Sequence, residues 1–414
     1  MQVTAADVDD AFERLRDVAI LSPLHVSHRL SDLSGASVWL KREDLQPVRS
    51  YKIRGAYNFI AQLTAEQRLA GVVCASAGNH GQGVSLACAR LGVRASVFVP
   101  TTTPRQKRER IVALGGGLVD LVVVGDDYDD SSRYSCEAAD RTGMMMVPAF
   151  DDPRTIAGQG TVAREIVEQL GKAPDVVIVP VGGGGMVAGI LTWFAEYCPQ
   201  TLVLGVEPSG AACLQAALDA GEPRELESID TFVEGAAVRK AGTLPHAIAA
   251  RHQLQLLSVP EGAVCREMLQ LYQVDGIIAE PAGALATSVF DQWTPEPGET
   301  VVAILSGGNN DVSRYAEIIE RALINEGRKH YFLVNFPQEP GTLRRFLDDV
   351  LGPNDDITYF EYVKRSNREL GPALVGIELG SRDDLPGLRD RIQHSRIEVE
   401  TIDPQSAMFR FLIS

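Results

Sequence analysis

Lys52 is the residue of this sequence best placed to act as a nucleophile. It lies in the stretch Arg49 to Asn58, between two arginines, Arg49 and Arg54, and directly after Tyr51. A lysine amine is a poor nucleophile at its free pKa, but neighbouring cations and partial burial lower that pKa. We therefore expect Lys52 to form an imine with a carbonyl cofactor. A lone lysine is more often a solvated surface residue, so this interpretation depends on three later motifs.

The second motif is a glycine-rich turn between an expected strand and an expected helix. Such a turn points backbone N–H groups and a helix N-terminus at an anion, here a substrate carboxylate. Asn79 can also donate an amide hydrogen bond to a phenolic or carboxylate oxygen. The alternative is that Asn79 only caps the helix, and for His80 packing or capping is the favoured role. The turn is Ser76-Ala77-Gly78-Asn79-His80-Gly81-Gln82-Gly83.

The third motif is a run of four glycines that follows an apolar strand ending at Pro180-Val181 and opens an apolar helix. Four glycines let the chain curl so that consecutive N–H groups bind a phosphate, helped by the helix dipole. The run fits neither G-x-G-x-x-G nor G-x-x-x-x-G-K-[ST], which argues against a dinucleotide or a nucleoside triphosphate. A tight turn alone would rarely need four glycines. The segment is Gly182-Gly183-Gly184-Gly185-Met186.

The fourth motif, Ser306-Gly307-Gly308-Asn309, follows an expected strand at 301–305. Ligands of parallel sheets bind at the carboxyl ends of strands, where a serine hydroxyl can donate to a neutral ring nitrogen. Taken alone, such a serine is more often a helix cap. Together, the four motifs supply an amine for an imine, a phosphate site, an amide for an aromatic hydroxyl and a hydroxyl for a ring nitrogen. Pyridoxal 5'-phosphate presents the four matching groups.

Alternating strands and helices must position these motifs. We expect strands at 71–75, 96–99, 121–124 and 144–147 with helices between them, and further strands at 176–181, 202–207 and 301–305. Such alternation indicates parallel sheets covered by helices. Near the N-terminus we expect short strands at 24–30 and 38–41 and, after Lys52, a helix from about 55 to 63.

After position 325 the pattern changes. Strands are expected at 329–335, 357–364, 373–378 and 397–401, with helices at 340–350 and 385–393. This β-α-β-β-α-β order is that of a ferredoxin-like domain. We therefore expect a catalytic domain over 1–325, with a small α/β subdomain at about 45–150 and a large one from the rest, a linker at 326–328, and a second domain over 326–414.

The composition is typical of a soluble globular protein, with 45% hydrophobic and 23% charged residues among 414. A net charge of −16 without a long basic run argues against nucleic acid or an anionic membrane as a partner. The six cysteines form no C-x-x-C pair, so neither a zinc site nor a disulfide framework is expected. An acidic N-terminus unlike a targeting peptide, and the lack of a long apolar run, indicate a cytoplasmic protein.

The ordered motifs resemble those of the pyridoxal-phosphate enzymes of the tryptophan-synthase-β fold (fold type II), and within it the biosynthetic threonine dehydratases. The resemblance covers nearly the whole chain. It rests on the four motifs above together with Lys41-Arg42-Glu43-Asp44, Phe150-Asp151-Asp152, Gly158-Gln159-Gly160-Thr161 and Glu280-Pro281-Ala282-Gly283-Ala284.

The resemblance implies a role for each motif. Lys52 would hold the cofactor as an internal imine and later move the α-proton. Asn79 would contact the 3-hydroxyl, the segment 182–186 the phosphate, and Ser306 the pyridine nitrogen. Residues 76–80 would hold the substrate carboxylate, and Glu280 would lie near the cofactor ring.

The neutral partner of the ring nitrogen favours β-elimination. Many pyridoxal enzymes place an acid there, which keeps the ring protonated as a full electron sink. A serine weakens that sink, so the β-hydroxyl should leave with, or just after, the α-proton. Such chemistry converts L-threonine to 2-oxobutanoate and ammonia, the first step of isoleucine biosynthesis. The group that protonates the leaving hydroxyl stays open, and the cofactor phosphate is one candidate.

Two departures from related enzymes narrow the expected reaction. Serine racemases of this fold carry a second serine in the carboxylate loop, where this chain has Ala77, which disfavours racemisation. Metal-activated relatives carry two carboxylates six residues apart, whereas Glu207 is followed by Cys213. A thiol is a poor ligand for a hard cation, so we expect no magnesium or calcium there.

The tail resembles the ACT-like regulatory domain of biosynthetic threonine dehydratases through Phe336-Pro337, Pro340-Gly341 and Thr342-Leu343. It has room for one such unit. The resemblance implies that isoleucine binds there, across a subunit contact, and lowers threonine affinity. It also implies that valine opposes isoleucine and that the protein is a homotetramer. A tail that only aids assembly is the competing interpretation.

Three other functions compete with threonine dehydration. An L-serine dehydratase would use the same chemistry and is the main alternative. A β-replacement synthase of the cysteine-synthase type fits the sequence around Lys52 and Asn79 less well. A non-catalytic amino-acid sensor is disfavoured because all four cofactor-binding motifs are intact.

Overall fold

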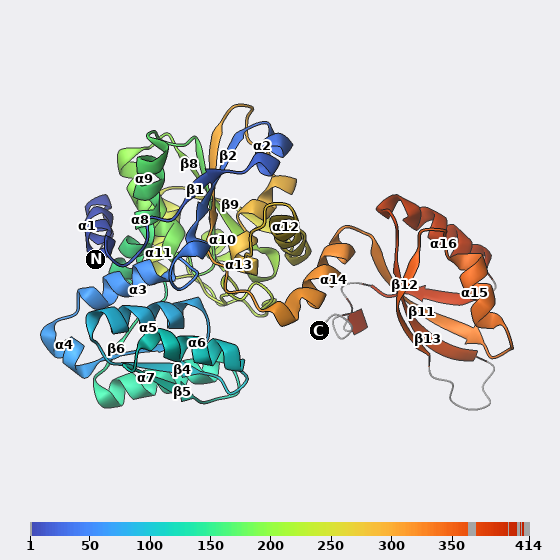
Figure 1. The fold of residues 1–414 in the computed structure, drawn as a ribbon, viewed down its shortest axis with the longest axis horizontal. Helices are drawn as coiled ribbons and strands as arrows, with labels where there is room; N and C mark the ends of the chain where they lie inside the picture. Colours follow the sequence, from blue (N-terminus) through green and yellow to red (C-terminus); the bar gives the residue numbers. More distant parts are fainter. Residues whose placement is uncertain (1, 363–369, 396, 404–405, 407, 410–414) are drawn as a thin grey trace. The chain divides into compact units, whose positions relative to one another are not determined.

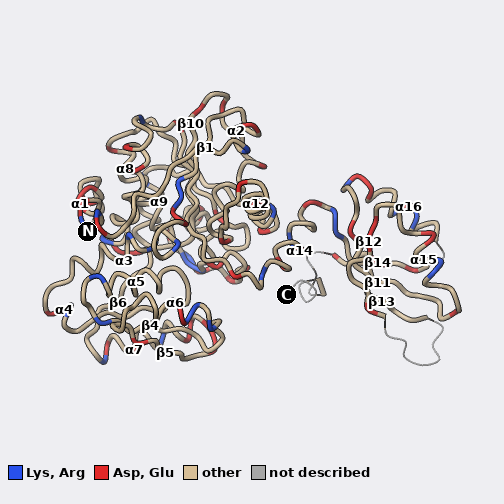
Figure 2. Tube along the Cα trace, in the orientation of Figure 1, with Lys and Arg blue, Asp and Glu red and all other residues tan. Residues whose placement is uncertain are grey.

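The computed structural model describes residues 2–362, 370–395, 397–403, 406 and 408–409, which fall into two compact units, 1–310 and 311–414 (Figure 1). Basic and acidic residues are both scattered along the traces of the two units (Figure 2). Among the described residues, no helix is both long enough and apolar enough to cross a membrane.

The larger sheet of the first unit has the order β1-β2-β10-β7-β8-β9. Its strands are parallel except for β1, which runs antiparallel to β2. Every residue of the central strand β10 is buried, as expected for a strand covered by helices on both faces. The strands are β1 (Leu24–Val26), β2 (Ser37–Arg42), β7 (Val176–Pro180), β8 (Leu202–Pro208), β9 (Gln255–Val259) and β10 (Thr300–Leu305).

The helices of this part of the first unit come from before and after the smaller sheet in the sequence. Residues of α1, α8 and α9 contribute to the main hydrophobic core. The helices are α1 (Ala5–Leu15), α2 (His28–Ser34), α8 (Pro153–Leu170), α9 (Gly185–Tyr197), α10 (Cys213–Ala220), α11 (Thr243–Arg251), α12 (Glu261–Gln273) and α13 (Pro281–Ala284), with the short 3₁₀ turns η1 (Glu43–Leu45), η2 (Ser209–Ala211) and η3 (Thr287–Asp291).

The smaller sheet of the first unit is fully parallel, with the order β5-β4-β3-β6. It has its own core, to which α3, α5 and α6 contribute. Its elements are α3 (Lys52–Ala61), α4 (Ala65–Ala70), β3 (Val72–Ala75), α5 (Asn79–Leu91), β4 (Ala95–Val99), α6 (Arg105–Gly115), β5 (Val119–Val123), α7 (Tyr128–Thr142) and β6 (Met145–Met146).

Two local expectations near the lysine motif were wrong. The expected strand at 24–30 ends at Val26, because the Ser27 hydroxyl accepts a hydrogen bond from the Leu30 N–H and starts α2. A serine cap competes with continued strand pairing. The helix expected from position 55 begins three residues earlier, so Lys52 is the first residue of α3.

The second unit contains an antiparallel sheet of order β12-β13-β11-β14. The β-α-β-β-α-β order predicted from the sequence is confirmed, although positions 363–364 of one expected strand lie outside the described residues. Its elements are η4 (Val312–Arg314), α14 (Tyr315–Asn325), β11 (Lys329–Pro337), α15 (Thr342–Val350), β12 (Asp356–Tyr362), β13 (Leu370–Glu378), η5 (Arg382–Asp384), α16 (Leu385–His394) and β14 (Glu398–Thr401).

Candidate active site

The lysine motif and the serine motif meet at the carboxyl end of β10. The Tyr51 N–H donates to the Ser306 carbonyl at 3.1 Å, and Ser50 forms an isolated β-bridge with Gly307. These backbone contacts hold Lys52, at the first position of α3, beside the turn that follows β10. Two motifs separated by about 250 positions therefore lie next to each other, as a shared cofactor site requires.

The asparagine motif lies against the same lysine. A Cβ built on Gly83, in the second turn of α5, would lie 3.1 Å from both the carbonyl carbon and the carbonyl oxygen of Lys52. The lack of a side chain at Gly83 thus lets α5 approach the start of α3 closely. The Lys52 Nζ lies 4.9 Å from the centre of the Tyr51 ring.

His80 is a buried, neutral residue. Its Nε2 lies 2.8 Å from the carbonyl oxygen of Val147, which can only accept, so the proton is on Nε2. Burial, and secondarily the charge of Lys52, lowers the pKa of His80 to about 4. This environment fits the packing role that the sequence favoured for His80.

Asn79, Glu280 and Asn309 form a hydrogen-bonded cluster. The Asn79 Nδ2 donates to Glu280 Oε1 at 2.5 Å, and the Asn309 Nδ2 donates to Asn79 Oδ1 at 2.7 Å. Burial raises the pKa of Glu280 to about 7, although the Asn79 hydrogen bond opposes this shift. Gly307 packs so closely under the carboxylate that a Cβ there would overlap Glu280 Oε1. Glu280 thus lies in the cluster around Asn79.

Ser306 is buried at the end of β10, where its hydroxyl donates to the Ala282 carbonyl at 3.0 Å. A hydroxyl hydrogen can rotate to another acceptor. Donation to a ring nitrogen would therefore require Ser306 to exchange this internal hydrogen bond for the new one.

Three of the four glycines, Gly182 to Gly184, lie in the turn between β7 and α9, and Gly185 begins α9. All four are tightly packed. A Cβ on Gly183 would lie 2.5 Å from the Phe150 ring, and one on Gly184, whose φ is +91°, would lie 2.7 Å from Pro245 Cβ. The preceding residue, Gly184, has no side chain that could cap the helix, and among the described residues no side-chain cap takes the first N–H groups of α9. A phosphate site at a helix N-terminus needs such N–H groups.

Glu207 and Cys213, which the sequence analysis considered as metal ligands, have other partners. The Glu207 carboxylate accepts from the backbone N–H groups of Leu214 and Gln215 at 2.8 and 2.9 Å and so caps α10. The Cys213 thiol donates to the Gly182 carbonyl at 3.5 Å. Within the described part of the chain, no group of three or more His, Cys, Asp or Glu residues is arranged to hold a metal.

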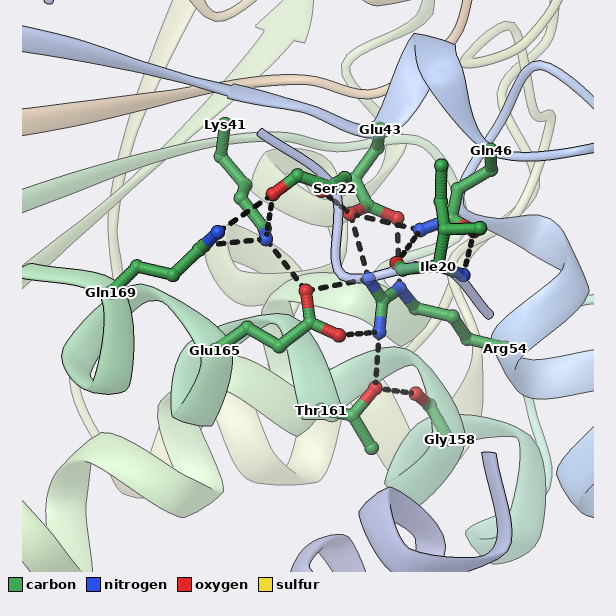
Figure 3. Close-up of polar contacts among 10 residues, drawn as sticks. All are labelled: Ile20, Ser22, Lys41, Glu43, Gln46, Arg54, Gly158, Thr161, Glu165 and Gln169. Carbon is green, nitrogen blue, oxygen red and sulfur yellow. Dashed lines mark hydrogen bonds and ion pairs between the residues drawn. The ribbon is translucent and has the colours of Figure 1, made fainter. Parts of the chain in front are cut away.

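A buried ionic network anchors the helix that begins with Lys52 (Figure 3). Arg54 donates to both oxygens of Glu43, each at 2.8 Å, and to both oxygens of Glu165, at 2.6 and 2.9 Å. Its remaining N–H donates to the Thr161 hydroxyl at 3.1 Å. Burial alone would lower the pKa of Arg54, but the two carboxylates outweigh burial and raise it. All five guanidinium donors are thus used.

Lys41 completes the network. Its Nζ donates to Glu165 Oε2 at 2.6 Å, to Gln169 Oε1 at 2.8 Å and to the Ser22 carbonyl at 2.9 Å. Two cations and two carboxylates therefore balance in charge and tie β2, η1, α3 and α8 together. No pattern in the sequence predicted this network. The local signal was the mixed charged run 41–44, at the end of the strand expected at 38–41.

The residues present fit pyridoxal phosphate. An amine at the head of α3, an amide cluster around Asn79, a buried hydroxyl at the end of β10 and an uncapped helix N-terminus all belong to the first unit. Each matches one group of that cofactor, in the order that the sequence motifs predicted.

Comparison with known proteins gives the same assignment. Residues 16–307 match the family described as pyridoxal-phosphate dependent enzyme, and residues 320–412 match the C-terminal regulatory domain of threonine dehydratase. The biosynthetic L-threonine dehydratase IlvA of Mycobacterium bovis is 58% identical over 413 residues, with 99% of this chain and 96% of that protein covered.

Solved structures share the fold of the first unit. The processed form of threonine deaminase isoform 2 from Solanum lycopersicum matches with a TM-score of 0.71 and 38% identity, over 77% of this chain and 93% of that chain. A maize serine racemase matches with a TM-score of 0.70 and 27% identity, over 78% of this chain and 99% of that chain. Enzymes with different reactions thus share this fold, and the reaction must be argued from the site.

Proposed function

This chain belongs to the family of pyridoxal-phosphate-dependent enzymes, and we infer that it converts L-threonine to 2-oxobutanoate and ammonia by β-elimination. The observation that carries this inference is the meeting of Lys52, Asn79 and the Ser306 turn at one sheet edge, in a chain that is 58% identical to a biosynthetic L-threonine dehydratase. The reaction is a lyase step of amino-acid biosynthesis.

When bound, the cofactor supplies an electron sink for the bond between the α-carbon and its hydrogen. The backbone N–H groups of 182–186 would hold its phosphate, Asn79 its 3-hydroxyl, and the Ser306 hydroxyl its ring nitrogen. The Lys52 amine would hold its carbonyl carbon and then accept the α-proton of the substrate. Glu280 would lie near the ring, within the Asn79 cluster.

The substrate carboxylate would bind the turn at 76–80, at the N-terminus of α5. Gly78 immediately precedes α5, and within the described part of the chain no side-chain cap is found at the start of that helix. An uncapped helix N-terminus attracts a carboxylate for the same reason that α9 attracts a phosphate. With Ala77 in this turn, no second hydroxyl is present there to act on the opposite face of the substrate.

L-Serine dehydration is the second candidate, because L-serine carries the same β-hydroxyl. The regulatory tail favours threonine as the main substrate, since residues 320–412 match the regulatory domain of threonine dehydratases. A non-catalytic sensor is the third candidate. A yellow protein whose colour borohydride removes would exclude it.

We also propose that the second unit makes the enzyme allosteric. Isoleucine would bind this ACT-like unit and lower the affinity for threonine, and valine would oppose isoleucine. A homotetramer in the cytoplasm is the proposed state, by analogy with the family. Light scattering of the purified protein tests the oligomer directly.

One assay tests the proposed reaction. Release of 2-oxo acid would be measured from L-threonine, L-serine and D-serine, each with and without isoleucine. We expect the highest kcat/KM for L-threonine, a lower value for L-serine, and none for D-serine. A higher kcat/KM for L-serine would replace the proposal by serine dehydration, and no release from any substrate would refute both.

A further inference from the structure

Asn309 connects three segments of the candidate site. We propose that Asn309 is a positioning residue. It sets the orientation of the Asn79 amide, and it holds Glu280 and the loop before Lys52 in fixed positions relative to that amide. This proposal rests on the proposed function, because it assigns Asn79 to the cofactor. The motif containing Asn309 was recognised in the sequence, but no role was assigned to this residue.

The contacts of Asn309 use every N–H that it has. Its Nδ2 lies 2.7 Å from Asn79 Oδ1 and 2.8 Å from the Val48 carbonyl oxygen. Its backbone N–H donates to Glu280 Oε2 at 3.2 Å. An asparagine amide nitrogen carries two hydrogens, and both are thus committed, one to Asn79 and one to the chain that leads into α3.

These contacts leave the Asn79 amide only one orientation. Its Oδ1 faces the Asn309 donor, and its Nδ2 faces the Glu280 carboxylate at 2.5 Å. Rotation of the amide by half a turn would place its oxygen against the carboxylate and its nitrogen against a second N–H donor. A protonated Glu280 could still donate to that oxygen, but the contact with Asn309 would place two N–H donors against each other in either protonation state of Glu280. The Asn309 donor therefore selects the orientation, because a buried polar group without a partner is costly.

The orientation matters because only the nitrogen side of an amide can donate. Glu280 takes one hydrogen of the Asn79 Nδ2, and the second is the donor for the phenolic oxygen of the cofactor. The contact with the Val48 carbonyl lies four residues before Lys52. Asn309 therefore fixes the amide and, through the backbone, the start of the helix that presents the amine.

A purely structural role is the competing explanation. The turn after β10 is also held by backbone contacts that do not involve the Asn309 side chain, such as the Gly308 N–H to the Arg49 carbonyl at 2.9 Å. If the side chain served only the turn, its loss would lower thermal stability and leave cofactor binding unchanged. Cofactor affinity and the spectrum of the bound cofactor therefore separate the two roles.

The test uses two variants and a matched control. Asn309→Asp keeps the shape but replaces the donor by an acceptor, and Asn309→Ala removes the side chain. We expect both to raise the Kd of pyridoxal phosphate by about 10-fold or more and to shift the visible absorption of the bound cofactor. At saturating cofactor, kcat for L-threonine should fall by about 10-fold and KM should change little.

The matched control is Asn310→Asp, which adds the same charge one position away. The buried Nδ2 of Asn310 has no hydrogen-bond partner among the described residues, so this variant should keep the wild-type Kd and spectrum.

A double variant tests whether Asn309 acts through Asn79. In an Asn79→Ala background, Asn309→Ala should raise the Kd further by less than about threefold. An equal effect in both backgrounds, a wild-type Kd and spectrum for both Asn309 variants, or an equal spectral shift in Asn310→Asp would each overturn the proposal. If Asn309→Asp lost its native far-UV circular dichroism, Asn309→Ala would decide. Because cofactor Kd and absorption need no substrate, failure of the threonine assay would leave this test intact.

Discussion

The Arg54 guanidinium and the Glu165 carboxylate lie 2.6 Å apart, with exposed side-chain fractions of 1% and 5%. Such a buried pair is costly to break, because removal of one partner leaves the other charged and without compensation. We predict that Arg54→Lys lowers the free energy of unfolding of the first unit by about 3 kcal/mol. An ammonium group has three donors where the guanidinium has five, so it cannot bind both oxygens of Glu43 and both oxygens of Glu165 as Arg54 does. The midpoint and slope of urea unfolding measure this change.

The control for this variant is Arg105→Lys. Arg105 pairs with Glu109 on the surface of α6, where the two side chains are 82% and 61% exposed. Exposed ion pairs contribute little to stability, so the urea midpoint of Arg105→Lys should equal that of the wild type within the error of the measurement. Equal stability of Arg54→Lys and the wild type would show that the network is not needed to hold α3.

Gly183→Ala should weaken cofactor binding. The new methyl group would lie 2.5 Å from the Phe150 ring, so the turn must shift, and overpacking of this kind costs about 1–3 kcal/mol. A shifted turn misplaces the N–H groups proposed to bind the phosphate. Fluorescence titration of the apoenzyme should then show a Kd for pyridoxal phosphate raised by about 10-fold.

A second glycine separates this effect from general destabilisation. Gly143 ends α7 with φ of +73°, and a Cβ there would meet no heavy atom within 4 Å. Gly143→Ala should cost about 1 kcal/mol through backbone strain and leave cofactor affinity unchanged. The interpretation of the tetraglycine turn fails if the two variants bind the cofactor equally well.

Glu207→Gln should change how stability depends on pH. Burial raises the pKa of Glu207 from 4.5 to about 7, against the two backbone hydrogen bonds that lower it. A group whose pKa is higher in the folded state binds more protons there than in the unfolded state. Its contribution to the free energy of unfolding is therefore fully present below pH 4.5 and is lost as the pH rises to 7. The loss amounts to about 3 kcal/mol.

The measurement is urea unfolding of the apoenzyme between pH 5 and pH 8. The wild type should lose more stability over this range than Glu207→Gln, whose amide does not titrate. Parallel pH profiles of the two proteins would show that Glu207 is ionised in the folded state throughout this range.

The sequence predicted well those features that depend on local pattern. The apolar residues 301–305 indicated the buried strand β10, and the tetraglycine run indicated a turn before α9. The β-α-β-β-α-β order of the tail followed from alternating hydrophobicity and a Pro-Gly helix start. Each of these signals lies within about ten neighbouring residues, where periodicity and backbone preference act.

Features that depend on distant partners could not be predicted in the same way. Arg54 and Glu165 are 111 positions apart, and neither local segment shows that its charge is buried. Asn309 was recognised as part of a motif, but its contact with Asn79 spans 230 positions. The backbone contact that holds Tyr51, and with it Lys52, beside Ser306 also joins segments that are far apart in the sequence. Tertiary contacts, not local preference, therefore determine how the candidate site is assembled.

Lys52→Ala should abolish turnover and the reducible colour together. Without the amine, the cofactor carbonyl has no covalent partner and the α-proton has no base, so kcat should fall by about 10³-fold or more. Absorption spectra before and after borohydride treatment measure the covalent link. Lys172→Ala is the control, because the Lys172 Nζ donates to the Thr300 hydroxyl at 2.8 Å, at the opposite end of β10 from Ser306. Colour that borohydride still removes from Lys52→Ala would place the covalent link on another lysine.

Removal of the second unit should uncouple the enzyme from isoleucine. All residues proposed to bind the cofactor or the substrate lie within 1–310, a compact unit, so a chain ending at Asn310 should still convert L-threonine. Initial rates as a function of isoleucine concentration should then show no inhibition. A chain ending at Asn325, which keeps α14, serves as the comparison because that helix groups with the second unit.

The full-length protein should show reciprocal coupling, because an effect of one ligand on the affinity for another acts equally in both directions. Threonine should therefore weaken isoleucine binding by the same factor by which isoleucine weakens threonine binding. Inhibition that persisted in both shortened chains would place the isoleucine site in the first unit.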